Sequence, residues 1–163
     1  KNENVEIIIG SLDKDLMQCL NVENISMYST RYKSFTTGDD VYKKFGVYPY
    51  QIPDFLALVG DSSDGIPGMN GIGKKTASLL LQNYESIENI YQNLNIWKNN
   101  IRSGERHANS IFENYELLKL FKSLTTLRLD VKVPKKIEKY SLSKLNSDEL
   151  NKFSAKYQLN INF

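Results

Sequence analysis

Short apolar runs alternate with turn signals over the first 46 residues, and this pattern predicts an α/β unit. Residues 5–10 are β-branched and almost entirely apolar, which is typical of a strand buried on both faces of a parallel sheet. Asp13 follows as a candidate N-cap of a helix through Leu16 and Leu20, and residues 25–35 predict one or two further strands. We therefore expect a strand, a helix and another strand to open the chain.

From residue 39 onward the apolar positions follow helical spacing. The spacing predicts helices at about residues 39–45, 55–59, 74–82, 86–93, 106–124 and 147–157. The first two of these should end at the glycines that follow them, Gly46 and Gly60. A glycine-rich loop at residues 61–73 separates two helices, and residues 127–133 indicate a short strand or an extended arm.

Composition removes several classes of protein. The chain of 163 residues has one cysteine, which excludes a disulfide framework and a cysteine-based zinc site. It lacks an apolar run of about 18 residues, so we expect no transmembrane helix and no membrane partner. Its first residues also lack the layout of a signal peptide.

The net charge of +2 hides an asymmetry between two parts of the chain. Residues 1–64 hold six Lys and Arg against ten Asp and Glu, whereas residues 65–163 hold fifteen against nine. Clustered carboxylates attract metal ions and spread lysines attract phosphates, so the asymmetry favours a cation site beside an anionic polymer. A solvated surface without a partner explains the charge alone equally well.

The strongest local signal is the run Gly71-Ile72-Gly73-Lys74-Lys75-Thr76, which stands between two apolar helices. Glycines allow a tight turn and a close approach to a ligand, and a helix N-terminus offers free N–H groups to a phosphate. Lysines in a first turn oppose the helix dipole unless an anion is bound. We interpret Gly71, Gly73, Lys74, Lys75 and Thr76 as a hairpin that binds a nucleic-acid backbone. The alternative is a plain tight turn between packed helices.

Four aspartates form a second signal, in two close pairs. Asp13 and Asp15 follow the first strand, at the edge where open α/β sheets place their ligands, and Asp61 and Asp64 follow a helix. Carboxylates suit Mg²⁺ or Mn²⁺. For either pair alone, a helix cap or an ordinary loop is an equally good explanation, but the two pairs together favour a metal site.

Two stretches carry a resemblance to a known family. The run Asp13-Lys14-Asp15-Leu16-Met17-Gln18 and residues 54–68, DFLALVGDSSDGIPG, resemble the 5′ to 3′ exonuclease domain of bacterial DNA polymerase I, in the flap endonuclease superfamily. The similarity continues through residues 71–77 and more loosely to 124–131. The chain departs from the family at Leu12 and Gly65, where glycine and asparagine are common, and at Asn70, where proline is common.

The resemblance implies a fold and an activity. The expected fold is an α/β remnant of a resolvase/PIN-like sheet at residues 1–46, followed by a mainly α-helical DNA-binding domain at 47–163. That domain would contain a helix-three-turn-helix (helix-hairpin-helix) at about 54–82. The implied parent is a metal-dependent 5′ to 3′ exonuclease or flap endonuclease of DNA replication and repair. Its two-metal site would use Asp13, Asp15, Asp61 and Asp64, with K⁺ at the hairpin.

The resemblance also implies what accompanies this chain. The other ligands of the two-metal site come from earlier segments in the family, so we expect a fragment that binds double-stranded or flapped DNA but does not cut it alone. The missing segment, or a partner chain, and a DNA polymerase are expected partners. The expected location is a compartment with DNA, a bacterial cytoplasm or an organelle such as a plastid. A non-catalytic nucleic-acid-binding module is the alternative.

Several further residues are weighed individually. Lys98, Arg102 and Arg106 are interpreted as a solvated helix face that could extend the grip on DNA. We expect His107 and Cys19 to be packing residues. Tyrosines most often mark a core or its rim, although Tyr48 and Tyr50 stand just before the helix expected to grip DNA.

Overall fold

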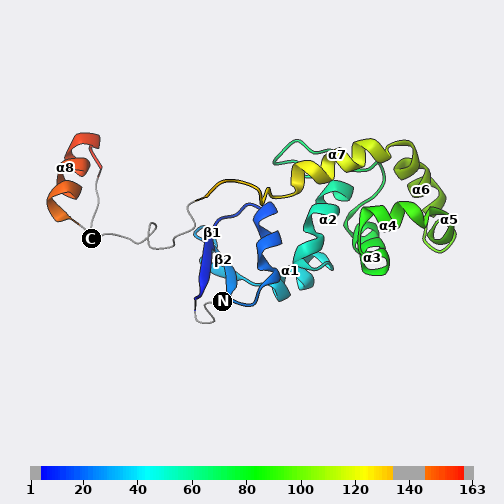
Figure 1. The fold of residues 1–163 in the computed structure, drawn as a ribbon, viewed down its shortest axis with the longest axis horizontal. Helices are drawn as coiled ribbons and strands as arrows, with labels where there is room; N and C mark the ends of the chain where they lie inside the picture. Colours follow the sequence, from blue (N-terminus) through cyan, green and yellow to red (C-terminus); the bar gives the residue numbers. More distant parts are fainter. Residues whose placement is uncertain (1–4, 134–145, 160–163) are drawn as a thin grey trace. The chain divides into compact units, whose positions relative to one another are not determined.

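The computed structural model describes residues 5–133 and 146–159. The chain divides into two compact units, residues 1–128 and residues 129–163. The first unit holds a small sheet and a series of helices (Figure 1). The second contains α8 (Ser147–Tyr157), whose N-cap is Asn146 and which has no buried residue. The predicted division at residues 46 and 47 stays a prediction, and the ends of both predicted parts lie outside the described residues.

The sheet has three strands in the order β1 (Ile7–Gly10), β2 (Ile25–Ser29) and β3 (Ser34–Thr36). β1 and β2 run parallel and are joined by η1 (Asp15–Asn21), a 3-10 helix, which confirms the predicted strand, helix, strand order. β3 runs antiparallel to β2.

The predicted burial of the first strand was wrong. Ile7 is 43% exposed and Ile8 52%, because β1 pairs only with β2 and forms an edge of the described sheet. A run of β-branched residues favours a strand, but it does not specify how many neighbours the strand has.

Two helices lead from the sheet to the loop. α1 (Gly38–Phe45) ends at Gly46, which has φ 70°, and α2 (Ile52–Val59) ends at Gly60, as the sequence predicts. Pro53 lies in the first turn of α2, where its missing N–H has no helical acceptor in any case. Between them lies the short 3-10 helix η2 (Pro49–Gln51).

The next helix is α3 (Lys74–Tyr84), and four further helices of the first unit follow it along the chain. They are α4 (Ile87–Gln92), α5 (Leu94–Trp97), α6 (Gly104–Glu113) and α7 (Tyr115–Thr125). The single helix predicted at 106–124 is therefore two helices, because the chain turns at Asn114, whose amide caps the Ser110 carbonyl at 2.9 Å. The apolar spacing did not predict α5, and residues 127–133 form no strand in the described structure.

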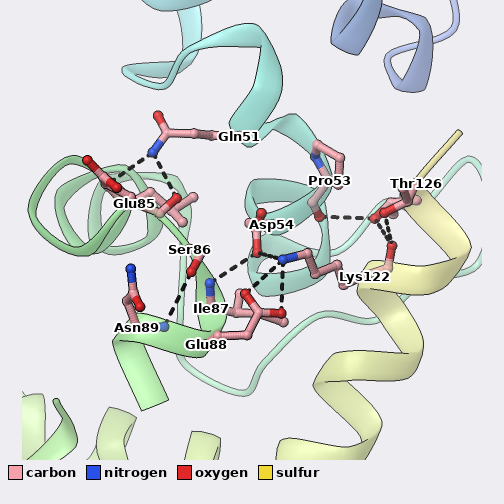
Figure 2. A network of polar contacts seen from close by, with 12 residues as sticks. Gln51, Pro53, Asp54, Glu85, Ser86, Ile87, Glu88, Asn89, Lys122 and Thr126 are labelled. Carbon is pink, nitrogen blue, oxygen red and sulfur yellow. Dashed lines mark hydrogen bonds and ion pairs between the residues drawn. The ribbon is translucent and has the colours of Figure 1, made fainter. Parts of the chain in front are cut away.

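A polar network locks α2 to α4 and α7 (Figure 2). The Lys122 ammonium lies 2.8 Å from the buried Asp54 carboxylate and 2.8 Å from Glu88. Asp54 also accepts the Ile87 N–H at 3.0 Å. Burial raises the pKa of Asp54. Burial acts in the same direction on Glu88, but the hydrogen bonds and positive charge of Lys122, together with hydrogen bonds from the backbone and Ser86, leave the pKa of Glu88 below its usual range. This network holds the helix that precedes the glycine-rich loop.

Candidate nucleic-acid interface

The loop between α2 and α3 begins with a close contact between two glycines. A Cβ atom on Gly68 would lie 2.4 Å from the Gly60 nitrogen, and both residues have positive φ, 72° and 87°. The Met69 N–H then donates to the Leu58 carbonyl at 2.8 Å, which holds the loop on the end of α2. These two glycines are required by the backbone itself, since no side chain fits there.

Asp61 lies inside this loop and is 2% exposed. Its backbone pairs with Ile66 in an isolated bridge, and its Oδ1 accepts the Lys14 ammonium at 2.5 Å, the Ser63 N–H at 3.0 Å and the Ser63 hydroxyl. Burial raises the pKa of Asp61, but the hydrogen bonds from Lys14 and Ser63 outweigh it and leave the pKa below its usual range. Asp61 is therefore an ionised carboxylate that is fixed by Ser63 of its own loop and by Lys14 from the turn between β1 and η1.

Asp13 and Asp15 lie at the turn between β1 and η1. The Asp13 carboxylate accepts the Asp15 N–H at 3.0 Å, but the N-cap of η1 is Lys14, which makes no side-chain cap hydrogen bond, so the N-cap predicted at Asp13 was wrong by one residue. Asp15 is partly buried, and its Oδ1 is buried without a hydrogen-bond partner. Burial, followed by the negative charges of Asp13, Asp64 and Asp61, raises the pKa of Asp15 to about 6.

The negative charges of Asp13, Asp61 and Asp64 all act on Asp15. The fold thus brings the two predicted aspartate pairs close together, although Asp61 lies 46 positions after Asp15 in the sequence. The oxygen donors suit a hard divalent cation, and the partnerless Asp15 Oδ1 is a ready ligand. In the part of the chain that the structure describes, however, no three acidic, histidine or cysteine groups are arranged to hold a metal ion. Lys14 already provides a positive charge at Asp61.

Lys14 was not among the site residues predicted from the sequence. Its position between the two aspartates was the available signal, since a lysine flanked by carboxylates often neutralises one of them. Only the tertiary structure shows that its partner is Asp61 rather than a neighbour in sequence.

The start of α3 lies at the other end of the loop. Gly71 has φ 81°, whereas Gly73 is extended with φ −91° and ψ 179° and forms the N-cap without a side chain to cap the helix. The first turn has no acidic residue, and Lys74 and Lys75 are exposed. A Cβ on Gly73 would meet no atom within 4 Å. The start of α3 is therefore open to an anion, and Gly73 is not required for packing.

Two residues of α6 lie under and beside this turn. The His107 ring would lie 3.5 Å from a Cβ on Gly71, and the ring is buried, as the sequence predicts, with its Nδ1 lacking a partner. Arg106 lines a pocket of about 460 Å³ together with Asn70 of the loop and Ser110. Glu105 and Glu113 also line this pocket, so its charge is mixed, and a contact of Arg106 with DNA stays a prediction.

Comparisons with known proteins cover most of the chain. The family model described as "5'-3' exonuclease, C-terminal SAM fold" matches residues 47–148. The chain is 42% identical over 120 residues to the 5'-3' exonuclease of Aquifex aeolicus, covering 73% of this chain and 40% of that protein. It is 36% identical over 155 residues to DNA polymerase I of Caldicellulosiruptor bescii, covering 92% of this chain and 18% of the polymerase.

Solved structures show the same fold. A structure titled as zinc bound to T5 5'-exonuclease matches with a TM-score of 0.63 at 21% identity, covering 74% of this chain and 42% of that one. A complex of the T5 D15 flap endonuclease with DNA and metal ions matches with the same TM-score and coverage. This chain thus spans less than half the length of these proteins. No helix among the described residues is long and apolar enough to cross a membrane.

Proposed function

The chain belongs to the 5'-3' exonuclease family with a C-terminal SAM fold, and from this premise we propose that it is the DNA-gripping part of a metal-dependent 5′ to 3′ exonuclease or flap endonuclease. The observation that carries the proposal is one loop that has negatively charged side chains at one end and positively charged side chains at the other. Asp61 and Asp64 lie near Asp13 and Asp15 at one end, and the lysine-rich start of α3 lies at the other. Such a loop suits a polymer whose phosphates must be held and cut at neighbouring positions.

The gripping role falls to the turn and the start of α3, a helix-hairpin-helix in this proposal. Gly73 leaves space for a phosphate to approach the N–H groups of Lys74, Lys75 and Thr76, where the helix dipole favours negative charge. These contacts involve the backbone of the duplex, so they select DNA shape and position rather than base sequence. A potassium ion at the turn fits the same proposal.

The carboxylates would hold divalent metal, Mg²⁺ or Mn²⁺. Such ions supply an activated water and stabilise the leaving oxygen when two are bound. Asp15 contributes an unpaired oxygen, and Asp61 is positioned by Ser63 and by the bridge to Ile66. A metal ion that binds Asp61 through Oδ1 would displace Lys14, which otherwise acts as a stand-in cation that limits repulsion between the aspartates.

The complete activity belongs to a longer protein in this proposal. The relatives are 5'-3' exonucleases and DNA polymerases I of which this chain spans 40% and 18%. We propose that cleavage requires a further segment or partner chain that provides the remaining ligands, that a polymerase acts in the same process, and that the protein works in a compartment with DNA.

The alternative, a non-catalytic DNA-binding module, is favoured by one observation. Lys14 occupies Asp61, and no metal-holding group of three is formed among the described residues. A module that only binds would keep this ion pair permanently, whereas a nuclease would exchange it for metal. The two functions are therefore separated by what happens at Lys14 when Mn²⁺ is added.

Binding to DNA is tested at Gly73. The Gly73→Val substitution places a β-branched side chain where the structure is open, so we expect an intact fold and about a tenfold loss of duplex affinity. Gly10→Val is the matched control, because a Cβ at Gly10 also meets no atom within 4 Å. Fluorescence anisotropy with a labelled duplex measures both. Unchanged affinity in the folded Gly73 variant would show that the turn is only structural.

Catalysis is tested in the complete protein. Asp64→Asn and Asp61→Asn should each lower turnover by orders of magnitude while duplex affinity stays equal or rises, because the loss of negative charge relieves repulsion of phosphates. Manganese binding, measured by electron paramagnetic resonance, should weaken in parallel. Parental turnover and parental manganese binding in both variants would favour the non-catalytic module.

A further inference from the structure

Three exposed tyrosines form a contiguous group on the first unit, which we call the tyrosine stack: Tyr42 of α1 with Tyr48 and Tyr50 around η2. The rings of Tyr48 and Tyr50 are stacked, with centroids 5.8 Å apart and planes 5° from parallel, whereas the ring of Tyr42 is tilted by 31° against Tyr48 at a centroid distance of 4.8 Å. The side chains are 40%, 50% and 51% exposed. Three large aromatic rings in contact with one another and with solvent are unusual for a surface without a ligand.

The packing of the core does not require the tyrosine stack. Around η2, buried and exposed residues alternate along the chain, with Val47, Pro49 and Gln51 buried and Tyr48 and Tyr50 exposed. Val47 is fully buried, and the Gln51 amide donates to the Leu81 carbonyl at 2.9 Å. The inward positions therefore fix this segment against α3, and the tyrosines are directed away from it.

The tyrosine stack lies close to the proposed grip on DNA. At the end of α1 the Gly46 carbonyl accepts the Gln82 amide at 2.6 Å, and a Cβ on Gly46 would lie 3.2 Å from that of Ser78. Ser78 is one helical turn from Lys74 and Lys75. The end of α1 that carries Tyr42 thus rests on α3 just beyond its open first turn.

Charge at this junction is complementary to a nucleic acid. The last turn of α1 carries Lys43 and Lys44, and the first turn of α3 carries Lys74 and Lys75. Asp39 and Asp40 belong to the first turn of α1: Asp40 is engaged by Thr37 and lies 3.9 Å from the Lys43 ammonium, and Asp39 lines a pocket with Glu23 and Tyr48. The positive charge is therefore confined to the last turn of α1 and the first turn of α3. Aromatic rings flanked by lysines form the surface that binds single strands, because every base has a face that can stack.

We propose that the tyrosine stack binds unpaired bases of DNA beside the duplex held at the start of α3. The proposal rests on the proposed function and deepens it by naming the form of the DNA: a duplex that continues into a single strand. An end ring of a three-ring stack has one face that the other rings leave uncovered, so Tyr42 and Tyr50 each offer a position for a base. The flanking lysines contact the phosphates of the same strand.

The test uses the 163-residue chain and two separate probes, an oligonucleotide of about twelve thymidines and a blunt duplex. We expect Tyr48→Ala and Tyr50→Ala each to weaken binding of the single strand about tenfold and to leave duplex binding unchanged. Tyr48→Phe should retain affinity, because the ring still stacks. Tyr32→Ala is the matched control, since Tyr32 is 67% exposed and lies in the turn between β2 and β3.

Each other outcome has a definite meaning. Failure of the parent chain to bind the single strand, or an equal loss on both probes, would overturn the proposal. Sedimentation that shows a dimer abolished by Tyr48→Ala and Tyr50→Ala would also overturn it and assign the tyrosine stack to contact between copies of the chain. Loss of duplex binding in Gly73→Val with single-strand binding intact would separate the grip from the tyrosine stack, so the two proposals fail independently.

Discussion

The starts of α1 and α3 differ in how the unpaired N–H groups and partial positive charge of a helix N-terminus are neutralised. At α1, Thr37 and Asp40 form a capping box, with the Thr37 N–H donating to Asp40 at 2.9 Å, and the first turn carries two acidic residues. At α3, Gly73 provides no cap and the first turn carries two lysines. Among the described helices of eight residues or more, only α3 lacks an acidic residue in its first turn.

The difference shows where the chain has satisfied its own polar groups and where it has left them open. A helix start has unpaired N–H groups and a partial positive charge, which acidic residues and caps normally neutralise. α1 is neutralised within the chain. α3 adds positive charge instead, which is favourable only when an anion from outside completes the site. The start of α3, which is proposed to bind DNA, therefore lacks the stabilisation that a cap and acidic residues give to the start of α1.

The largest effect is expected when the charge of the α3 start is reversed. Lys74→Glu with Lys75→Glu gives α3 an acidic first turn like that of α1, and we expect duplex affinity to fall about 100-fold. The plot of log affinity against log salt should become less steep, with the magnitude of its negative slope smaller by about two. Titrations at several salt concentrations measure both quantities.

The converse change at α1 is its control. Asp39→Lys with Asp40→Lys should leave duplex affinity within about threefold and lower the free energy of unfolding by about 1 kcal/mol, through loss of the capping box and the favourable dipole contact. Equal losses of affinity in both double variants would mean that general charge, and not the α3 start, binds DNA.

A lysine that is already satisfied should behave unlike Lys74. Lys122→Met leaves the buried Asp54 carboxylate without its ion pair, and we expect the free energy of unfolding to fall by about 2 kcal/mol, less than for a fully buried pair because Lys122 keeps some exposure. Duplex affinity of the folded fraction should not change. Urea unfolding followed by circular dichroism gives the first quantity.

Lys119→Met is the matched control for Lys122→Met. Lys119 lies one turn earlier on α7, where its ammonium pairs with the exposed Glu116 at 2.7 Å and lies 5.2 Å from the centroid of the Tyr115 ring, so its loss should change the free energy of unfolding by less than about 0.5 kcal/mol. A similar cost for both lysines would contradict the structural role given to the network of Asp54, Glu88 and Lys122.

The caps themselves give a smaller and sharper contrast. Thr37→Ala removes a working cap and should lower the free energy of unfolding by about 1 kcal/mol without affecting DNA binding. Gly73→Ala should change stability by less than about 0.5 kcal/mol, because φ and ψ at Gly73 suit any residue, and should weaken DNA binding instead. Thermal unfolding measures the stability of both variants, and fluorescence anisotropy on the same samples measures their binding to DNA. A loss of stability in Gly73→Ala would contradict the conclusion that the start of α3 is open at Gly73.

The smallest effect concerns pH. Hydrogen bonds from the backbone and then the hydroxyl of Thr37 lower the pKa of Asp40 below 3.8. The stabilisation from ionised Asp40 is therefore complete above pH 3.8 and is lost as the pH falls through the lower, folded-state pKa. The free-energy difference between the parent and Asp40→Asn should be constant above about pH 5 and shrink at acid pH. A difference that stays constant through the acid range would remove Asp40 from the cap.

Most helix and strand positions were predictable because their signals are local. Gly46 and Gly60 end α1 and α2 where the sequence places them, since a positive φ after a helix suits glycine. The β-branched run at residues 7–9 gave β1, and β2 was predicted from Ile25 and the aromatic Tyr28, for a similar reason. The break at Asn114 was not predictable, because apolar spacing continues across it and a side-chain hydrogen bond to Ser110 closes the end of α6.

The candidate site divides in the same way. The residue types and the order of the loop, from Asp61 to Gly73, are properties of the sequence, and so is the choice of lysine rather than an acid at the start of α3. The approach of Asp13 and Asp15 to that loop, the pairing of Lys14 with Asp61 and the contact of Tyr42 with Tyr48 were decided by tertiary structure. Hydrophobic spacing specifies which face of each element is buried, but charges and rings distant in sequence meet only after those faces have packed, and their energies depend on the resulting distances and burial.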